Sequence, residues 1–160
     1  MRRAERIVTD SGELNQLLKS GNYGVLSMAD NAGPYAVPVN FGWDGKNIYV
    51  HCATAGRKLE ILKNSPRVFF TVVINDEIGA KANSHLACSY TNYFSSVCAS
   101  GKAELLTAEA SPEAHLYGMR CICAQYGLEN LPIDPKVLKV TLLIKITPEE
   151  ITGKRNRAPG

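Results

Sequence analysis

The sequence contains no apolar run that approaches the roughly 18 residues needed for a membrane-spanning helix. The charged residues at its start, 1–6, are not followed by the apolar segment of a secretory signal. It also lacks a dinucleotide-binding fingerprint of the Gly-x-Gly-x-x-Gly type, so no separate nicotinamide domain is expected. These absences predict no membrane partner and, by default, a cytoplasmic location.

Cysteine and histidine are present, but not in the patterns of a disulfide framework or a metal site. The five cysteines are an odd number, which argues against complete pairing and favours a reducing compartment. Two Cys-x-x-Cys pairs are absent, and Cys121-x-Cys123 is a weak zinc pattern because side chains two apart on a helix diverge. The three histidines share no metal-ligand spacing. We expect buried structural thiols and no bound metal.

The formal net charge is only +3, and part of it lies in Lys154, Arg155 and Arg157. Such a segment is more often a solvated tail than a nucleic-acid-binding arm, and no nucleic-acid-binding motif accompanies it. Hydrophobic residues make up 45% and charged residues 21% of the 160 residues, as in ordinary globular proteins. We expect one domain over 1–160, with a flexible tail from about residue 153, and no nucleic-acid partner.

Alternating hydrophobic residues predict a mainly β protein. Strands are expected over 23–29, 35–43, 47–51, 67–74, 93–106 and 137–146, and helices over 10–20, 55–63 and 111–127. Residues 75–90 are polar and give no clear pattern. Because helices and strands do not alternate strictly, a parallel doubly wound sheet is not expected. We expect a small antiparallel β-barrel of about six strands, with two or three helices packed outside it.

End signals define the two longer helices. Asp10 is expected to cap the first, with Glu13 three residues on and Gly21 at its end. Ser111 is expected to cap the other and Gly127 to close it. The buried face of this second helix is expected to contain Leu116, Met119, Tyr126 and either Ile122 or Cys123, which leaves His115 on the surface.

Arg57 and Lys58 lie at the start of the short helix that follows His51. With Thr54 as the N-cap, both cations fall in or beside the first turn, where the helix dipole disfavours positive charge. An anion held there by free backbone N–H groups and by the two side chains would remove this conflict. Gly56 would let the backbone approach that anion closely. The alternative is a pair of exposed basic residues screened by solvent.

Pro38 lies within the alternating segment 34–41. Proline removes a donor from a strand and marks an edge or an irregularity, and free backbone groups at such a place could hydrogen-bond a flat heteroaromatic ligand. Val37 and Val39 share one face, and Asn40, on the opposite face, could add an amide contact. The alternative is an ordinary edge strand.

Ser95 and Ser96 lie early in the strand expected over 93–106. Small hydroxyl residues at such a place can contact a phosphate or the edge of a ring, and they can equally be plain surface serines. Both interpretations stay open on the residues alone.

Three motifs, in this order, resemble one known family. They are Pro-Tyr-x-Val-Pro-Val-Asn-Phe from residue 34, His-x-Ala-x-x-Gly-Arg-Lys from residue 51 and Ser-Val-x-x-x-Gly-Lys-Ala-Glu from residue 96. The chain resembles the pyridoxamine 5′-phosphate oxidase-related superfamily over nearly all of its length. Within that superfamily it is most similar to the nitroimidazole-resistance-type flavoproteins.

The resemblance implies a homodimeric split β-barrel that binds FMN at the subunit interface. Residues 37–40 would line the isoalloxazine ring, Arg57 and Lys58 would bind the phosphate, and Ser96 would reach the flavin from the partner subunit. His51 and Cys52 would lie on the strand that contacts the flavin. The full set of expected cofactor-binding residues is Val37, Pro38, Val39, Asn40, His51, Cys52, Thr54, Arg57, Lys58, Ser95 and Ser96.

The implied function is an FMN-dependent oxidoreductase that reduces small electron-poor substrates, as nitroimidazole-reducing relatives do. A nicotinamide docked directly over the flavin, or a partner reductase, would supply electrons. The alternatives are a flavin-storage protein without turnover, a split barrel that binds haem or a deazaflavin, and a pyridoxamine 5′-phosphate oxidase. The oxidase is disfavoured because Asn40 stands where those enzymes typically carry a lysine, and because their C-terminal Arg- and Pro-containing substrate segment is absent.

His51 has two interpretations. It could be a proton donor, a ligand or an attachment point near the flavin, since histidine titrates near neutral pH. It could instead be a packing and hydrogen-bonding wall of the site, which we favour. His51 and His85 are the suspect ligands if haem replaces FMN. No catalytic side chain, nucleophile–base pair or carboxylate pair can be identified from the sequence.

Overall fold

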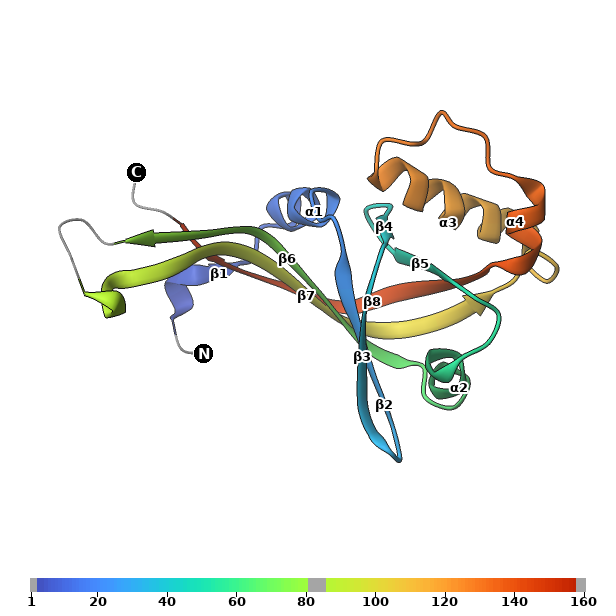
Figure 1. The fold of residues 1–160 in the computed structure, drawn as a ribbon, viewed down its shortest axis with the longest axis horizontal. Coiled ribbons are helices and arrows are strands. Elements are labelled where there is room, and N and C mark those ends of the chain that lie inside the picture. Colours follow the sequence, from blue (N-terminus) through green and yellow to red (C-terminus); the bar gives the residue numbers. More distant parts are fainter. Residues whose placement is uncertain (1–2, 81–85, 158–160) are drawn as a thin grey trace.

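A computed structural model describes residues 3–80 and 86–157, apart from the side chains of Asn75 and Asp76, and shows one curved antiparallel sheet with helices outside it (Figure 1). The strands are β1 (Ile7–Val8), β2 (Gly24–Asp30), β3 (Gly33–Val39), β4 (Gly42–Trp43), β5 (Ile48–Cys52), β6 (Arg67–Ala80), β7 (Tyr90–Leu106) and β8 (Leu142–Asn156). The helices are α1 (Ser11–Lys19), α2 (Arg57–Asn64), α3 (Pro112–Gln125) and α4 (Pro135–Val140), with short 3₁₀ turns at Ala4–Arg6 and Ala87–Ser89. The expected mainly β split-barrel class is confirmed.

The sheet is split between its two edge strands. Its order is β3-β2-β6-β7-β8-β5-β4, with β1 paired to β8 beside this path. β3 and β4 follow each other in the chain but stand at opposite ends of that order. Pro38 therefore lies in an edge strand, as its missing donor predicts. Over the described residues the sheet has eight strands, two more than the sequence indicates.

The end of α3 causes the break between β3 and β4. The backbone N–H of Phe41 donates to Tyr126 Oη at 3.1 Å, and that of Trp43 donates to Gln125 Oε1 at 3.3 Å. Side chains of another element thus take hydrogen bonds that a partner strand would otherwise take. The expectation of one continuous strand over 35–43 is therefore wrong.

The same two side chains also hold the end of α1. Gln125 Nε2 lies 3.0 Å from the carbonyl oxygens of Leu18, Lys19 and Gly21. Tyr126 Oη donates to the carbonyl of Asn22 at 2.7 Å. The carbonyls that a helix end leaves unpaired thus gain donors, and three segments distant in sequence meet beside the β3–β4 connection.

Two cores lie on opposite sides of the sheet. The larger fills the barrel with inward-facing residues that alternate along the strands, including Leu26, Val50, Phe70, Val97 and Ile144. The smaller lies outside, where α3 covers β5 and β8 (Figure 1), and contains Tyr49, Leu106, Met119, Ile122 and Leu143. A strand with apolar residues on both faces is buried on both sides, and β5 and β8 follow that rule.

The last strand begins later and ends later than expected. Residues 137–140 belong to α4, because Asp134 caps that helix by accepting from the backbone N–H of Lys136 at 2.8 Å. β8 then pairs with β7 as far as the Phe94–Asn156 pair. The expected flexible tail is therefore wrong for residues 153–156, which are held in the sheet, and its last residues, 158–160, lie outside the described part.

β6 and β7 are also longer than expected. Residues 75–80 continue β6 through a bulge between Ile74 and Glu77, although their polar sequence gives no strand signal. β7 begins at Tyr90, three positions before its expected start. Residues 81–85, which include His85, lie outside the described part of the chain.

The predicted helix ends agree with the structure better than the predicted buried face of α3 does. Asp10 caps α1 by accepting from the backbone N–H of Glu13 at 2.7 Å. The expected buried face of α3 is wrong in part. Leu116 is 43% exposed, whereas His115 is 1% exposed and its Nε2 lies 2.8 Å from the carbonyl of Thr141. The helix is rotated so that this imidazole finds a backbone partner inside.

The cysteines are all free thiols, as expected, but they are not all buried. Cys52 is buried, Cys98, Cys121 and Cys123 are half-buried, and Cys88 is exposed. Among the residues that the structure describes, no group of three His, Cys, Asp or Glu side chains could hold a metal ion. Within the same residues, no helix has the length and apolar character required to cross a membrane.

Candidate functional site

The first turn of α2 is open to an anion. Gly56, and not the expected Thr54, is the N-cap, since its φ of 130° is one that glycine adopts readily. No side chain caps the helix, and the backbone N–H of Leu59 donates to the carbonyl of Gly56 at 3.0 Å. Among the described residues, the first-turn donors left without a partner are therefore the N–H groups of Arg57 and Lys58. A Cβ built on Gly56 would meet nothing within 4 Å. Free donors beside open space fit a phosphate oxygen.

Arg57 extends from this turn to the tip of the β2–β3 hairpin. Its guanidinium lies 3.9 Å from Asp30 Oδ1 and stacks over the ring of Tyr35, with 4.7 Å between Cζ and the ring centroid. The Arg57 side chain is 50% exposed, and an ion pair this open to solvent contributes little to stability. The hairpin thus orients Arg57 but leaves its guanidinium available for another partner.

Lys58 lies toward the end of β5, near His51 and Cys52. Partial burial lowers the pKa of His51, and the charge of Lys58 lowers it further. Burial raises the pKa of the Cys52 thiol, an effect that Lys58 opposes. Alternation along β5 places His51 on the exposed side and Cys52 in the barrel core. The two expected site residues of β5 therefore face opposite ways, and only His51 is accessible.

Replacing Lys58 with methionine is expected to raise the pKa of His51. The lysine charge disfavours the imidazolium, so its removal shifts the pKa back toward the ordinary value for histidine. The recovery is partial because burial, the larger cause, remains. NMR titration of the His51 ring in both proteins measures the change, with the buried His115 as an internal reference. An unchanged pKa for His51 would contradict the placement of Lys58.

The residues from Val37 to Asn40 offer two faces, as expected. Val37 and Val39 are half-buried against the barrel core, whereas Pro38 and Asn40 are exposed. Tyr35, two residues before Val37, lies on the valine face and meets Arg57. β3 therefore runs from Tyr35, beside the Arg57 guanidinium, toward the exposed Asn40 just after its end.

Ser95 and Ser96 lie on opposite faces of β7. Ser96 is half-buried and donates to the carbonyl of Lys154 at 3.4 Å, while Ser95 is 6% exposed on the inner face. His51 on β5 is the cross-strand partner of Leu143 on β8, and Leu143 is in turn the partner of Leu106 on β7. Leu106 lies ten residues beyond Ser96 along β7. At about 3.3 Å per residue this separation is roughly 30 Å. One chain therefore does not bring these serines to Arg57 and Lys58.

Sequence reasoning missed Asp30 and Tyr35, the two partners of Arg57. Tyr35 stands in the first of the three motifs, and alternation puts it on the same face as Val37. No local signal pairs either residue with position 57, since the contact depends on how α2 packs against β2.

A family model described as pyridoxamine 5′-phosphate oxidase matches residues 10–155. The chain belongs to this family. The match covers every motif that carries the resemblance, from residue 34 to residue 104. No curated protein matches the chain.

Solved structures of similar architecture support the split-barrel fold of this family member. A protein described as a 5-nitroimidazole antibiotic resistance protein from Bacteroides thetaiotaomicron has a TM-score of 0.78 at 21% identity, covering 92% of this chain and 85% of its own. A flavocytochrome from Azotobacter vinelandii gives 0.79 at 22%, covering 99% and 73%. An FAD and haem binding protein from Mycobacterium smegmatis gives 0.77 at 17%, covering 96% and 74%. At these identities the likeness shows the fold alone.

Proposed function

We propose that this pyridoxamine 5′-phosphate oxidase family member is an FMN-binding oxidoreductase that reduces small electron-poor molecules. The observation that carries the proposal is the first turn of α2. Uncapped N–H groups, open space over Gly56 and the cations Arg57 and Lys58 meet there. The same convergence of donors and positive charge is typical of phosphate sites. Flavocytochrome and FAD-binding relatives support a flavin as the phosphate-bearing ligand.

The residues around α2 would have different roles in binding the flavin. Arg57 would form a bidentate contact with the phosphate, and Lys58 would add a point charge. Asp30 competes for the same guanidinium, but its 3.9 Å contact is weaker than a charge-assisted hydrogen bond. Edge strand β3, with the exposed Asn40, would hydrogen-bond the ring system along its free side. The bound flavin would supply the redox chemistry, while the protein supplies orientation and electrostatics.

We also propose that two copies associate through the outer face of β2, β6 and β7. Val73 and its cross-strand neighbour Ser96 share this face, as do Phe69 and Ser100. Val73 is 57% exposed and Phe69 is 45% exposed, so two large apolar side chains stand open on this face. Association there would bring Ser96 of one copy toward the flavin of the other. Sedimentation of the FMN-loaded protein tests this: a dimer is expected, and a monomer that still binds FMN fully would contradict it.

The redox activity is tested on the FMN-loaded protein. A nicotinamide donor should bleach the flavin absorbance, and a nitroaromatic acceptor should restore it with turnover. Flavin that binds but is reduced by no donor or partner reductase would support storage instead. Oxidation of pyridoxamine 5′-phosphate would support the oxidase that Asn40 disfavours.

A second candidate function is haem binding. Two structural relatives are described as a flavocytochrome and as an FAD and haem binding protein, and His51 is exposed near Lys58. A Soret band after addition of haem, lost in His51→Ala, would favour this function. A Soret band that persists in His51→Ala would exclude His51 as the ligand.

A further inference from the structure

Two side chains of the β2–β3 hairpin hold the Arg57 guanidinium, and they hold it in different ways. Arg57 lies over the ring of Tyr35, with 4.7 Å between Cζ and the ring centroid, and Asp30 Oδ1 lies 3.9 Å from a terminal nitrogen. The first distance is well within the range of a cation–π contact, which extends to about 6 Å. The second exceeds hydrogen-bond range. Tyr35 is therefore the closer-fitting partner of the two.

Asp30 belongs first to the turn at the hairpin tip. Its Oδ1 accepts from the backbone N–H of Ala32 at 2.9 Å, a local contact typical of aspartate in turns. The same oxygen is the one nearest Arg57, and solvent screens this ion pair because both side chains are partly exposed. Asp30 thus shapes the turn and holds Arg57 only weakly, so a bound phosphate could take its place.

The Tyr35 ring, by contrast, is anchored in the wall of the barrel. On β3 it is the cross-strand partner of Met28, which is 5% exposed. The ring itself is half-buried and packs against the larger core. A side chain that packing already fixes loses little further freedom when a ligand binds. Arg57 therefore extends from α2 onto a firmly held surface.

A stacked guanidinium keeps its hydrogen-bonding edge. The N–H donors of arginine lie in the plane of the group, whereas the Tyr35 ring occupies one face of that plane. Among the described residues, no hydrogen bond of the Arg57 side chain is found. Stacking and phosphate binding can therefore occur together, because the ring and the anion use different parts of the guanidinium.

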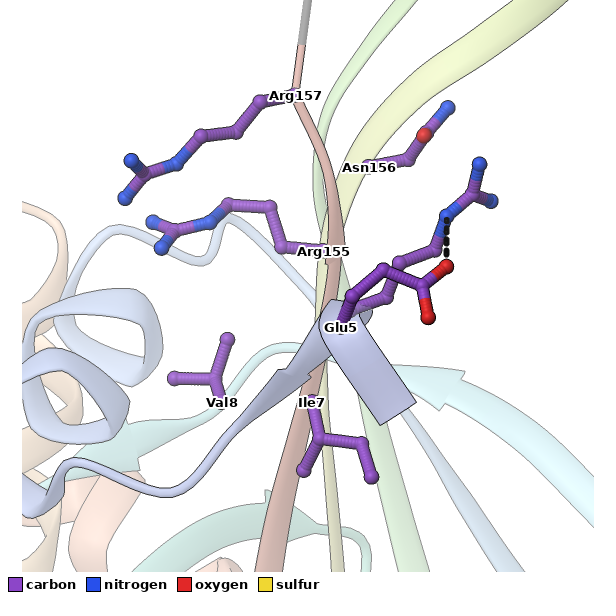
Figure 2. Close-up of a pocket in the computed structure, with 7 residues that line it drawn as sticks. Glu5, Ile7, Val8, Arg155, Asn156 and Arg157 are labelled. Atoms are coloured by element: carbon purple, nitrogen blue, oxygen red, sulfur yellow. Dashed lines mark ion pairs between the residues drawn. The ribbon is translucent and has the colours of Figure 1, made fainter. Parts of the chain in front are cut away.

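Arginines at the far end of β8 are held in another way. Figure 2 shows the Arg155 and Arg157 side chains extending to the same side of the strand. Glu13 forms a close ion pair with Arg155, and its Oε1 lies 3.7 Å from Arg157. A carboxylate therefore already lies where an anion would approach these groups. Arg57 has an aromatic face as its closest support, which leaves its edge open to an anion.

We propose that Tyr35 is a positioning residue for Arg57, and that it strengthens the preference of the site for a phosphate-bearing flavin over riboflavin. This role rests on the proposed function, because it takes the phosphate of FMN as the anion that Arg57 binds. Holding a long, flexible side chain in place before the ligand arrives reduces the entropy lost on binding. When the phosphate binds, Arg57 exchanges the distant Asp30 for it and keeps its stack on Tyr35.

The test compares FMN and riboflavin binding, by quenching of flavin fluorescence, in the wild type, Tyr35→Leu and Tyr35→Phe. Leucine keeps apolar packing but removes the ring, so FMN should bind about 2- to 30-fold more weakly, the range of a cation–π contact. Riboflavin affinity should not change, because riboflavin has no phosphate for Arg57 to bind. Tyr35→Phe should keep FMN affinity within about twofold of the wild type, because the ring remains.

A double-mutant cycle and a matched control show whether Tyr35 acts through Arg57. In an Arg57→Ala background, Tyr35→Leu should weaken FMN binding no further. Tyr117→Leu removes an exposed ring that packs on Tyr49, and it should leave FMN binding unchanged. The positioning role is overturned by unchanged FMN binding in Tyr35→Leu, by equal losses of FMN and riboflavin, or by the same FMN loss in both backgrounds.

A measurement on the ligand-free wild type decides the matter even if Tyr35→Leu does not fold. Nitrogen-15 relaxation of the arginine side chains should show Arg57 Nε more ordered, on the picosecond to nanosecond timescale, than Arg67 Nε. Arg67 is exposed and lies 3.3 Å from Glu149, so it represents an arginine held by a carboxylate. Equal mobility of the two groups would overturn the positioning role.

Pyrophosphate, titrated in a phosphate-free chloride buffer, separates failure of this role from failure of the proposed function. If the wild type binds no FMN but binds pyrophosphate, and binds it more tightly than Tyr35→Leu does, FMN binding is contradicted and the role of Tyr35 is supported. If FMN binds equally to both proteins, the flavin site is supported and the role of Tyr35 is overturned. A wild type that binds neither ligand would overturn both.

Discussion

Replacing both Arg57 and Lys58 with alanine is expected to weaken FMN binding by about 10²- to 10⁴-fold. Each side chain would lose a charge-assisted contact worth about 1.5–3 kcal/mol, and every 1.4 kcal/mol is tenfold in affinity. The fold should survive, since the Arg57 side chain is half exposed and its pair with Asp30 is weak. Quenching of flavin fluorescence measures the affinity, and circular dichroism checks the fold.

Two controls separate this effect from a general change of charge. Lys63→Ala removes a cation from the same helix. The Lys63 side chain is 58% exposed and paired with Glu60, so this variant should leave FMN binding unchanged. Asp30→Asn should tighten binding by up to about fivefold, because it removes a competing surface ion pair worth at most about 1 kcal/mol. Equal FMN affinity in the wild type and the double variant would overturn the site assignment.

Gly42→Ala is expected to lower the free energy of unfolding by about 3 kcal/mol. A Cβ at Gly42 would lie 2.5 Å from the backbone nitrogen of Ile122 and 2.6 Å from the carbonyl carbon of Cys121. Since backbone cannot rotate away as a side chain can, α3 would have to move off β4. At about 2–4 °C per kcal/mol, the melting temperature should fall by about 6–12 °C.

The matched control for Gly42→Ala is Gly12→Ala in α1. A Cβ there would lie 3.2 Å from Asp10 Oδ1, the atom that caps α1, so the carboxylate must shift by a few tenths of an ångström. The helix preference of alanine offsets this small loss. Thermal unfolding of Gly12→Ala should match or slightly exceed the wild type. If both variants unfold at the same temperature as the wild type, the close packing of the α3 backbone on β4 is incorrect. Because α3 also holds Phe41 and Trp43, Gly42→Ala should weaken FMN binding as well.

Features set by neighbouring residues could be predicted from the sequence. The Asp10 cap needs only Glu13, and the edge position of β3 follows from the missing donor of Pro38. The proposal of an anion site at Arg57 and Lys58 rests on the mismatch between cations and the helix dipole, and it stays a prediction. These predictions use interactions within a few residues.

Features set by distant partners could not be predicted. The break after Val39 depends on Gln125 and Tyr126, more than 80 positions away. The strand at residues 153–156 depends on pairing with β7, and a basic, polar segment gives no strand signal of its own. His115 is buried because the carbonyl of Thr141 lies within reach. In each case tertiary contacts override the local pattern.

The measurement that tests the central claim most directly is a comparison of FMN and riboflavin affinity for the wild-type protein. The two ligands differ only in the phosphate, so the ratio reports what the first turn of α2 contributes. Our account predicts that FMN binds at least about 100-fold more tightly, and that the difference disappears in Arg57→Ala/Lys58→Ala. Equal affinity of the wild type for both ligands would contradict a phosphate site at Arg57 and Lys58.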